Sequence, residues 1–120
     1  MNNQIYNLQN RLIEFSLSIL EISEKMPKSY AGQYFSKQLI RSGTSPAFHQ
    51  AEAQSAESVK DFVHKLKIGI KELRETKVNL IIISKKFLAK NSNVIETLKE
   101  SDELIAIFYS SIRTANKNSK

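Results

Sequence analysis

The apolar residues of this chain recur three and four positions apart over long stretches. Such spacing places an apolar line along one side of an α-helix and is typical of helices packed nearly parallel to their neighbours. Only three glycines and two prolines interrupt 120 residues, and period-two alternation bounded by tight turns does not occur. Helix is therefore the only regular structure that the sequence supports.

Four segments carry this spacing, and we expect helices at about residues 4–25, 30–54, 58–89 and 93–114. Pro27 ends the first, and Gly43 and Pro46 weaken the second, which we interpret as one kinked helix. The tail from Thr114 onward is expected to fray. The expected core lines are Ile5, Leu8, Leu12, Phe15, Ile19, Ile22 and Met26; Tyr34, Phe35, Leu39 and Ile40; Val59, Phe62, Leu66, Gly69, Leu73, Thr76, Leu80, Ile83 and Phe87; and Val94, Leu98, Ile105, Phe108 and Ile112.

Short connections between four amphipathic helices predict an all-α fold, an antiparallel up-down-up-down four-helix bundle in one domain over residues 1–120. A hydrophobic content of 41% supports one core at this length, and no cysteine is present. The longest aliphatic run, Leu80 to Ile83, is far shorter than the roughly 20 residues of a membrane helix. The N-terminus also lacks the order of a secretory signal. We therefore expect a soluble, cytoplasmic protein.

The stretch from Gln38 to Leu80 resembles the signature of the four-helix-bundle proteins encoded in intervening sequences of bacterial 23S ribosomal RNA genes. The resemblance is carried in order by Arg41-Ser42, Thr44-Ser45, Glu52-Ala53, Ser58, Lys60-Asp61-Phe62, Lys65-Leu66, Lys71-Glu72 and Glu75-Thr76, with Met26-Pro27-Lys28 before them. The chain departs from the pattern at Pro46 to His49 and at Val78-Asn79. The resemblance implies a bacterial homopentamer. It also implies kinship with an accessory protein of diversity-generating retroelements, which is basic and binds nucleic acid and reverse transcriptase.

The net charge of +6 is concentrated between Lys60 and Lys90, where there are nine basic and three acidic residues. The rest of the chain has nine of each. At about 100° per residue, five of the cations fall on one narrow line roughly opposite Leu66, Leu73 and Leu80. We call this line the basic stripe: Lys60, Lys67, Lys71, Arg74 and Lys85. Cations aligned on a rigid helix neutralise successive phosphates, so the stripe predicts nucleic-acid binding. A solvated face that only keeps the protein soluble is the alternative.

Charged residues at the positions of the family pattern have a second interpretation. We predict a structural ion-pair network, in which a bidentate contact from Arg41 to a carboxylate of the third helix ties that helix to the second. Its members are Arg41, Glu52, Asp61, Glu72 and Glu75. A catalytic pair of carboxylates is the alternative interpretation of the acidic members.

No constellation for catalysis or metal binding is evident. Asp61 and His64 do not make a closed metal site, which needs three or four ligands, and His49 stands apart from them. Ser42, Thr44 and Ser45 have no neighbouring base, and no phosphate-binding glycine loop occurs. We expect no catalytic residue, no metal and no cofactor, and hence a protein that is not an enzyme.

A second apolar line, Ile13, Leu17 and Leu20, is displaced from the main seam of the first helix, and Ile82 and Ile107 lie off the seams of the third and fourth. Exposed apolar residues grouped in this way usually mark an interface. We predict a homo-oligomer that associates through Ile13, Leu17, Leu20 and Ile82.

The combined hypothesis is an oligomeric basic scaffold that binds the RNA or DNA backbone without strong sequence specificity. The alternative is a module that docks an acidic protein partner, such as a reverse transcriptase or polymerase.

Overall fold

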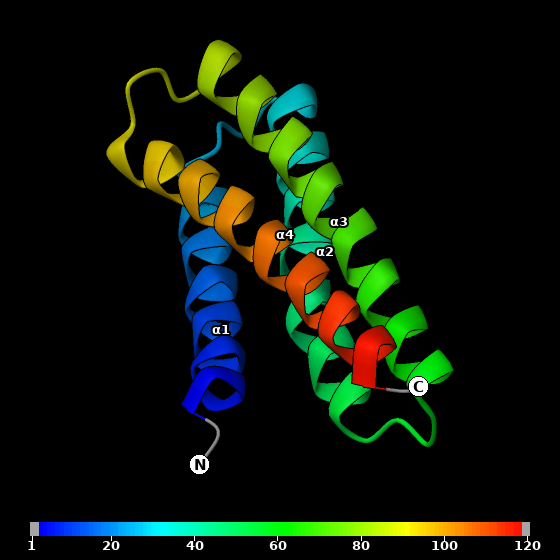
Figure 1. The fold of residues 1–120 in the computed structure, drawn as a ribbon. Coiled ribbons are helices and arrows are strands. Elements are labelled where there is room, and N and C mark those ends of the chain that lie inside the picture. Colours follow the sequence, from blue (N-terminus) through cyan, green and yellow to red (C-terminus); the bar gives the residue numbers. More distant parts are fainter. Residues whose placement is uncertain (1–2, 119–120) are drawn as a thin grey trace.

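The computed structural model describes residues 3–118, with side chains from residue 7 onward. It contains four helices, α1 (Asn3–Glu24), α2 (Tyr30–Gln54), α3 (Val59–Lys86) and α4 (Ser92–Asn118). Successive helices run in opposite directions and pack side by side, and α4 returns to contact α1 (Figure 1). The predicted all-α four-helix bundle is therefore confirmed.

The core follows the predicted lines in α1 and through most of α3, while the side chain of Ile5 lies outside the described residues. Two predicted core residues are instead exposed, Tyr34 by 49% and Val59 by 39%. In α4 Val94, Phe108 and Ile112 are buried as predicted, and Ile105 packs partly buried against the core. The prediction omitted Leu104, which is fully buried. The buried line of α4 is Val94, Thr97, Ser101, Leu104, Phe108 and Ile112. Its two hydroxyl residues hide it from a search for apolar spacing.

Side-chain caps define where three helices begin. Ser29 Oγ accepts a hydrogen bond from the Gly32 N–H at 3.1 Å, and Ser58 Oγ accepts one from the Asp61 N–H at 3.0 Å. At the start of α4, Asn91 Oδ1 accepts one from the N–H of Val94 at 3.1 Å. Each cap satisfies a backbone donor that has no partner within the helix.

The second helix is continuous through Gly43 and Pro46. A Cβ on Gly43 would lie 2.6 Å from Ile19 Cγ1, so the glycine allows α1 and α2 to approach closely. Nearby hydroxyls are bonded within the fold: Thr44 donates to the Ile40 carbonyl at 2.7 Å, and Ser42 accepts from Thr76 at 2.9 Å. The Thr44 hydroxyl is therefore satisfied within α2, and the Ser42 hydroxyl joins α2 to α3.

Two predicted helix ends are corrected. α3 stops at Lys86 rather than near residue 89, because the N–H groups of Phe87 and Leu88 both donate to the Ile83 carbonyl and Lys90 turns the chain with a φ of 60°. α4 does not fray from Thr114 but continues to Asn118. Half-buried Ala115 anchors this extension, and Lys117 lies in the last turn, where the helix dipole favours a cation.

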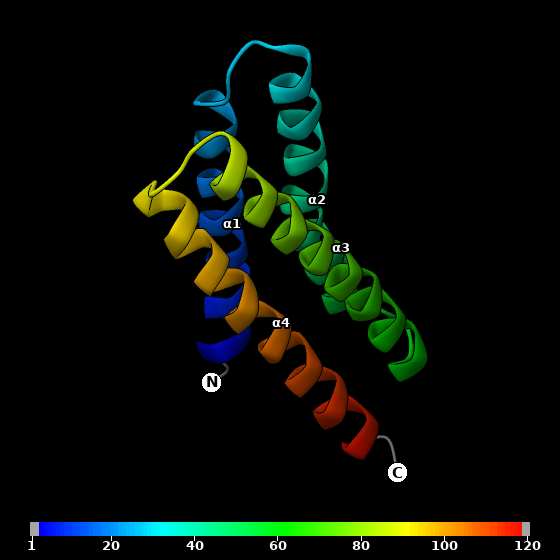
Figure 2. The ribbon, with the colours of Figure 1, turned by 90° about the horizontal axis from the view of Figure 1, so that it is seen from above.

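The contact between α1 and α4 is the smallest among neighbouring helices. Figures 1 and 2 both show α4 diverging from α1 towards the C-terminus, so that the bundle opens on this side. The structure thus presents two regions to consider as sites, the outer face of α3 and the opening between α1 and α4.

Candidate functional site

All five residues of the basic stripe are exposed on the outer face of α3. In the part of the chain that the structure describes, no carboxylate forms an ion pair with any of them. Two other cations of α3 are paired: Lys65 Nζ lies 3.4 Å from Glu52 Oε1, and Lys77 Nζ lies 2.8 Å from Asp102 Oδ1. The stripe therefore consists of cations of α3 whose charge is not neutralised by an ion pair among the described residues.

Arg74 is held in place by α4 without losing its charge. Its Nη2 donates to Tyr109 Oη at 3.2 Å, and its guanidinium lies 5.8 Å from the centre of the same ring. A cation over an aromatic face is attracted to the ring while its remaining donors stay open. Arg74 also lines a shallow groove with Lys67, Lys71 and Arg41. Four cations thus converge on one strip of surface, with Glu75 as the carboxylate among them.

Apolar side chains interrupt the second half of the stripe. Val78 and Ile82, exposed by 56% and 37%, fall on the same outer face of α3 between Arg74 and Lys85. Sequence analysis missed Val78, although its position four residues after Arg74 is the signal that places it in line. Ile82, assigned to an oligomer interface, and Lys85, assigned to nucleic acid, therefore share one surface.

The structure brings together three of the five residues predicted as an ion-pair network. Arg41 Nη1 lies 3.0 Å from Glu72 Oε1, and Nη2 lies 2.7 Å from Glu75 Oε1. Arg41 thus bridges two carboxylates one turn apart instead of gripping one carboxylate with both nitrogens. Hydrogen bonding to Glu75 raises the pKa of Arg41 above its usual value. This contact pairs two of the three carboxylates of α3 with a cation of α2.

The other two residues of that predicted network lie elsewhere. Glu52 contacts Lys65 and, at 3.9 Å, Nδ1 of His49. Asp61 lies in the first turn of α3, next to the Ser58 cap, and among the described residues it has no ion pair with Arg41. Among the described residues, the ion pairs between α2 and α3 therefore lie in two separate places, one at Arg41 and one at Lys65.

The second apolar line of α1 lies on the surface. Ile13, Leu17 and Leu20 are exposed by 44%, 53% and 38%. Ile107, in contrast, is half-buried and packs against the core, so it does not belong to an exposed patch. An unbroken apolar line on the outside of one helix is available for contact with another molecule.

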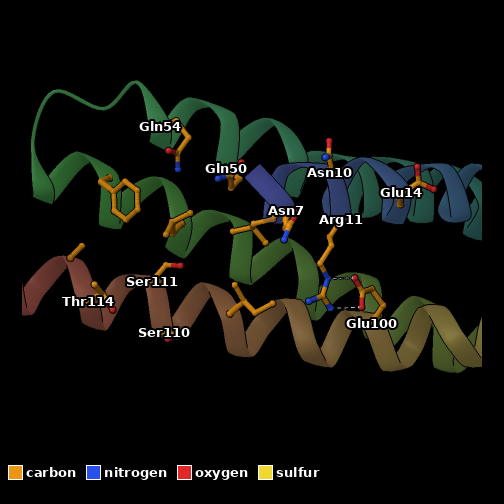
Figure 3. A pocket seen from close by; sticks show the side chains of 15 residues that line it. Asn7, Asn10, Arg11, Glu14, Gln50, Gln54, Glu100, Ser110, Ser111 and Thr114 are labelled. Carbon is orange, nitrogen blue, oxygen red and sulfur yellow. Dashed lines mark hydrogen bonds and ion pairs between the residues drawn. The ribbon is translucent and has the colours of Figure 1, made fainter. Parts of the chain in front are cut away.

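A cleft of about 770 Å³ lies where α1 and α4 diverge. Figure 3 shows Gln50 and Gln54 of α2 on one side, Ser111 and Thr114 of α4 on the other, and the contact between Arg11 and Glu100 towards one end. Its lining also includes Asn7, Leu8, Asn10, Glu14, Phe62, Leu66, Ile107, Ser110 and Ala115. Sequence analysis did not predict it, because the divergence of two helices leaves no local pattern in the chain.

Titratable residues outside these regions do not assemble into a reactive centre. Within residues 7–118, no group of three or more His, Asp or Glu side chains is placed to hold a metal ion. His64 is exposed, and His49 is half-buried beside Glu52. Among the described residues, no helix is both long and apolar enough to cross a membrane.

Fold and surface together define a small four-helix bundle whose third helix carries exposed, largely unpaired cations. The sequence profile of the 23S rRNA-intervening sequence protein family matches residues 4–110, and the chain belongs to this family. It is similar to a crystal structure from Bacteroides thetaiotaomicron, described as a protein with unknown function from the S23 ribosomal protein family. The TM-score is 0.80 at 28% identity, over 88% of this chain and 97% of that one. A search of the curated proteins finds no match.

Proposed function

We propose that this protein is a non-enzymatic, oligomeric scaffold of the bacterial cytoplasm that binds the RNA or DNA backbone without strong sequence specificity. The observation that carries the proposal is that five exposed cations share one face of α3, while Glu72 and Glu75 are ion-paired with Arg41. Phosphates that bind such a face release their counterions, which is favourable at low salt. The names of the family and of the solved relative both refer to the ribosome, which supports RNA as the first polyanion to test.

Binding to a structured RNA hairpin, measured between about 50 and 200 mM salt, tests this proposal. The variant Lys67→Gln, Lys71→Gln and Arg74→Gln removes three charges from the stripe. A matched control, Lys65→Gln, Lys77→Gln and Lys99→Gln, removes three charges elsewhere. We expect the first variant to reduce the slope of log affinity against log salt by about 2–3, since each lost phosphate contact removes about 0.7–0.9. Equal losses in both variants would show that net charge alone drives binding and would refute the stripe.

We propose further that the protein assembles as a homopentamer and that Ile13, Leu17 and Leu20 of α1, with Ile82 of α3, form the contact. The exposure of the α1 line supports this assignment. Leu17→Glu places a charge in the middle of the line and is expected to lower the mass measured by light scattering to that of the 13.7 kDa chain. Ile95→Glu, a comparably exposed apolar site on α4, serves as the control. An unchanged mass for Leu17→Glu would eliminate this interface.

The second candidate function is the docking of an acidic protein, such as a reverse transcriptase or polymerase. The resemblance to the accessory protein of diversity-generating retroelements suggests this candidate. Val78 and Ile82 favour it, because a phosphate backbone gains nothing from apolar side chains placed among the cations. Val78→Ser, which leaves Ile82 and the proposed oligomer contact unchanged, separates the two candidates. Affinity for RNA should remain within twofold, whereas affinity for a protein partner should fall by tenfold or more, as expected for losing about 1.4 kcal/mol of apolar contact.

A further inference from the structure

The cleft between α1 and α4 has the dimensions and lining of a small-molecule site. Its volume of about 770 Å³ lies within the range of roughly 300–1,000 Å³ that is usual for such sites. Apolar side chains of Leu8, Phe62 and Leu66 form part of its wall, and neutral amides and hydroxyls form much of the remainder. The cleft shares no lining residue with the groove beside the basic stripe, so it is separate from the proposed nucleic-acid surface.

Gln50 is the polar group of the cleft that lacks a partner. Its side chain lines the cleft and is 1% exposed, and its Oε1 is buried with no hydrogen bond among the described residues. Buried amide oxygens in folded proteins are nearly always hydrogen-bonded, because leaving one unpaired is unfavourable. An amide can rotate to exchange its oxygen and nitrogen, so a partner that both donates and accepts satisfies Gln50 in either orientation.

The charges around the cleft select against anions. Glu14 and Glu100 lie in its lining, and the one lining cation, Arg11, is already paired with Glu100 at 2.6 Å and with Glu103 at 2.8 Å. A phosphate or carboxylate brought to this end would meet more carboxylates than cations. The chemistry of the lining therefore fits a neutral ligand with an apolar face and one polar edge.

We propose that the cleft binds a neutral, planar ligand that carries an amide or lactam edge. The ring of the ligand would lie against Leu8, Phe62 and Leu66. Its N–H would donate to Oε1 of Gln50, and its carbonyl would accept from Nε2. Aryl carboxamides and nucleobases such as uracil share this edge. This proposal is independent of the function of the basic stripe and of the oligomeric state.

A titration of the isotope-labelled protein, followed by two-dimensional NMR of backbone and side-chain amides, tests the proposal. Benzamide should shift signals of residues that line the cleft, together with the side-chain amide of Gln50. Methyl benzoate keeps the ring and the carbonyl but has no N–H, and it should bind about tenfold more weakly. Uracil distinguishes the source of the edge: tighter binding than benzamide points to nucleobases, and weaker binding points to aryl carboxamides.

Two methionine variants provide the matched comparison. In Gln50→Met, benzamide and methyl benzoate should bind within about twofold of each other, because the paired edge is lost. Gln54→Met makes the same change one turn later, at an exposed position of the lining, and should keep the tenfold difference. The proposal is overturned if neither benzamide nor uracil shifts the cleft residues, or if the difference persists in Gln50→Met. Should Gln50→Met not fold, as judged by circular dichroism, equal binding of the two probes to the unmodified protein would still overturn it.

Discussion

The two sides of α1 are held by different physical means. Towards α2, Ile19 is fully buried and its side chain lies over Gly43, so close that a Cβ there would overlap it. Towards α4, the specific contacts are polar and come from long side chains. Arg11 Nε and Nη2 contact the two oxygens of Glu100 at 2.9 and 2.6 Å, and Asn93 Nδ2 donates to Glu21 Oε1 at 3.1 Å.

This difference explains why the cleft lies where it does. A glycine contact brings two helices together along their backbones and leaves no space between them. An arginine that reaches a glutamate spans a distance, so the two helices can diverge beyond the contact without losing it. The cleft follows from the second arrangement, since Arg11 and Glu100 both lie in its lining.

Gly43→Val should disrupt the contact between α1 and α2 and should have the largest effect on stability. The added Cβ would lie 2.6 Å from Ile19 Cγ1, and Ile19 has no exposed surface into which to move. The introduced side chain overpacks the contact, and Ile19 is β-branched and cannot easily change its rotamer in a helix. The free energy of unfolding should therefore fall by about 2–3 kcal/mol. Urea unfolding followed by circular dichroism measures it. Ala51→Val, exposed on the same helix, should cost only about 0.5 kcal/mol. Equal effects would mean that helix propensity, and not the α1–α2 contact, is what Gly43 contributes.

Arg11→Met should weaken the contact between α1 and α4 and lower the free energy of unfolding by about 1 kcal/mol. It removes two partly buried, charge-assisted hydrogen bonds to Glu100 while keeping much of the apolar stem. Hydrogen exchange should accelerate in the C-terminal half of α4 more than in α2. Arg113→Met, at an exposed position on α4, is the control and should be close to neutral. Uniform acceleration across all four helices would argue that Arg11 contributes to global stability only.

The contrast also marks how far the sequence predicts this molecule. Apolar spacing located α1 and α3, because Leu12, Ile19, Leu73 and Leu80 repeat with the period of the helix. In α4 it omitted Thr97, Ser101 and Leu104, although all three are buried. Spacing along α3 also placed the basic stripe on one face. Pairing was harder to predict, because which carboxylate Arg41 meets depends on the relative height of two helices.

The cleft and the Arg11 contact were not predicted for a related reason. Residues 11 and 100 are distant in sequence, and nothing near either of them specifies the other. The angle between α1 and α4 depends on how α1 packs on α2 and how α4 packs on α3, which is a property of the whole bundle. Local patterns therefore predict which face of each helix is buried, but not where two faces separate.

Glu100→Gln and Glu103→Gln test the two carboxylates that Arg11 contacts on α4, and they should have the smallest effects on stability. Glu100 is 29% exposed and receives both Nε and Nη2 of Arg11, whereas Glu103 is 65% exposed and receives only Nη2, at 2.8 Å. Hydrogen bonding to Glu100 is also the main cause that raises the pKa of Arg11 above its usual value.

Exposed pairs contribute roughly 0.2–1 kcal/mol, so we expect losses of about 0.7 kcal/mol for Glu100→Gln and about 0.3 kcal/mol for Glu103→Gln. The loss for Glu103→Gln should vanish in about 1 M salt, because screening acts most strongly on exposed charges. If instead the two variants lose the same stability at every salt concentration, the bidentate contact has no special weight, and the divergence of α4 from α1 must be maintained by the packing of both helices on α2 and α3.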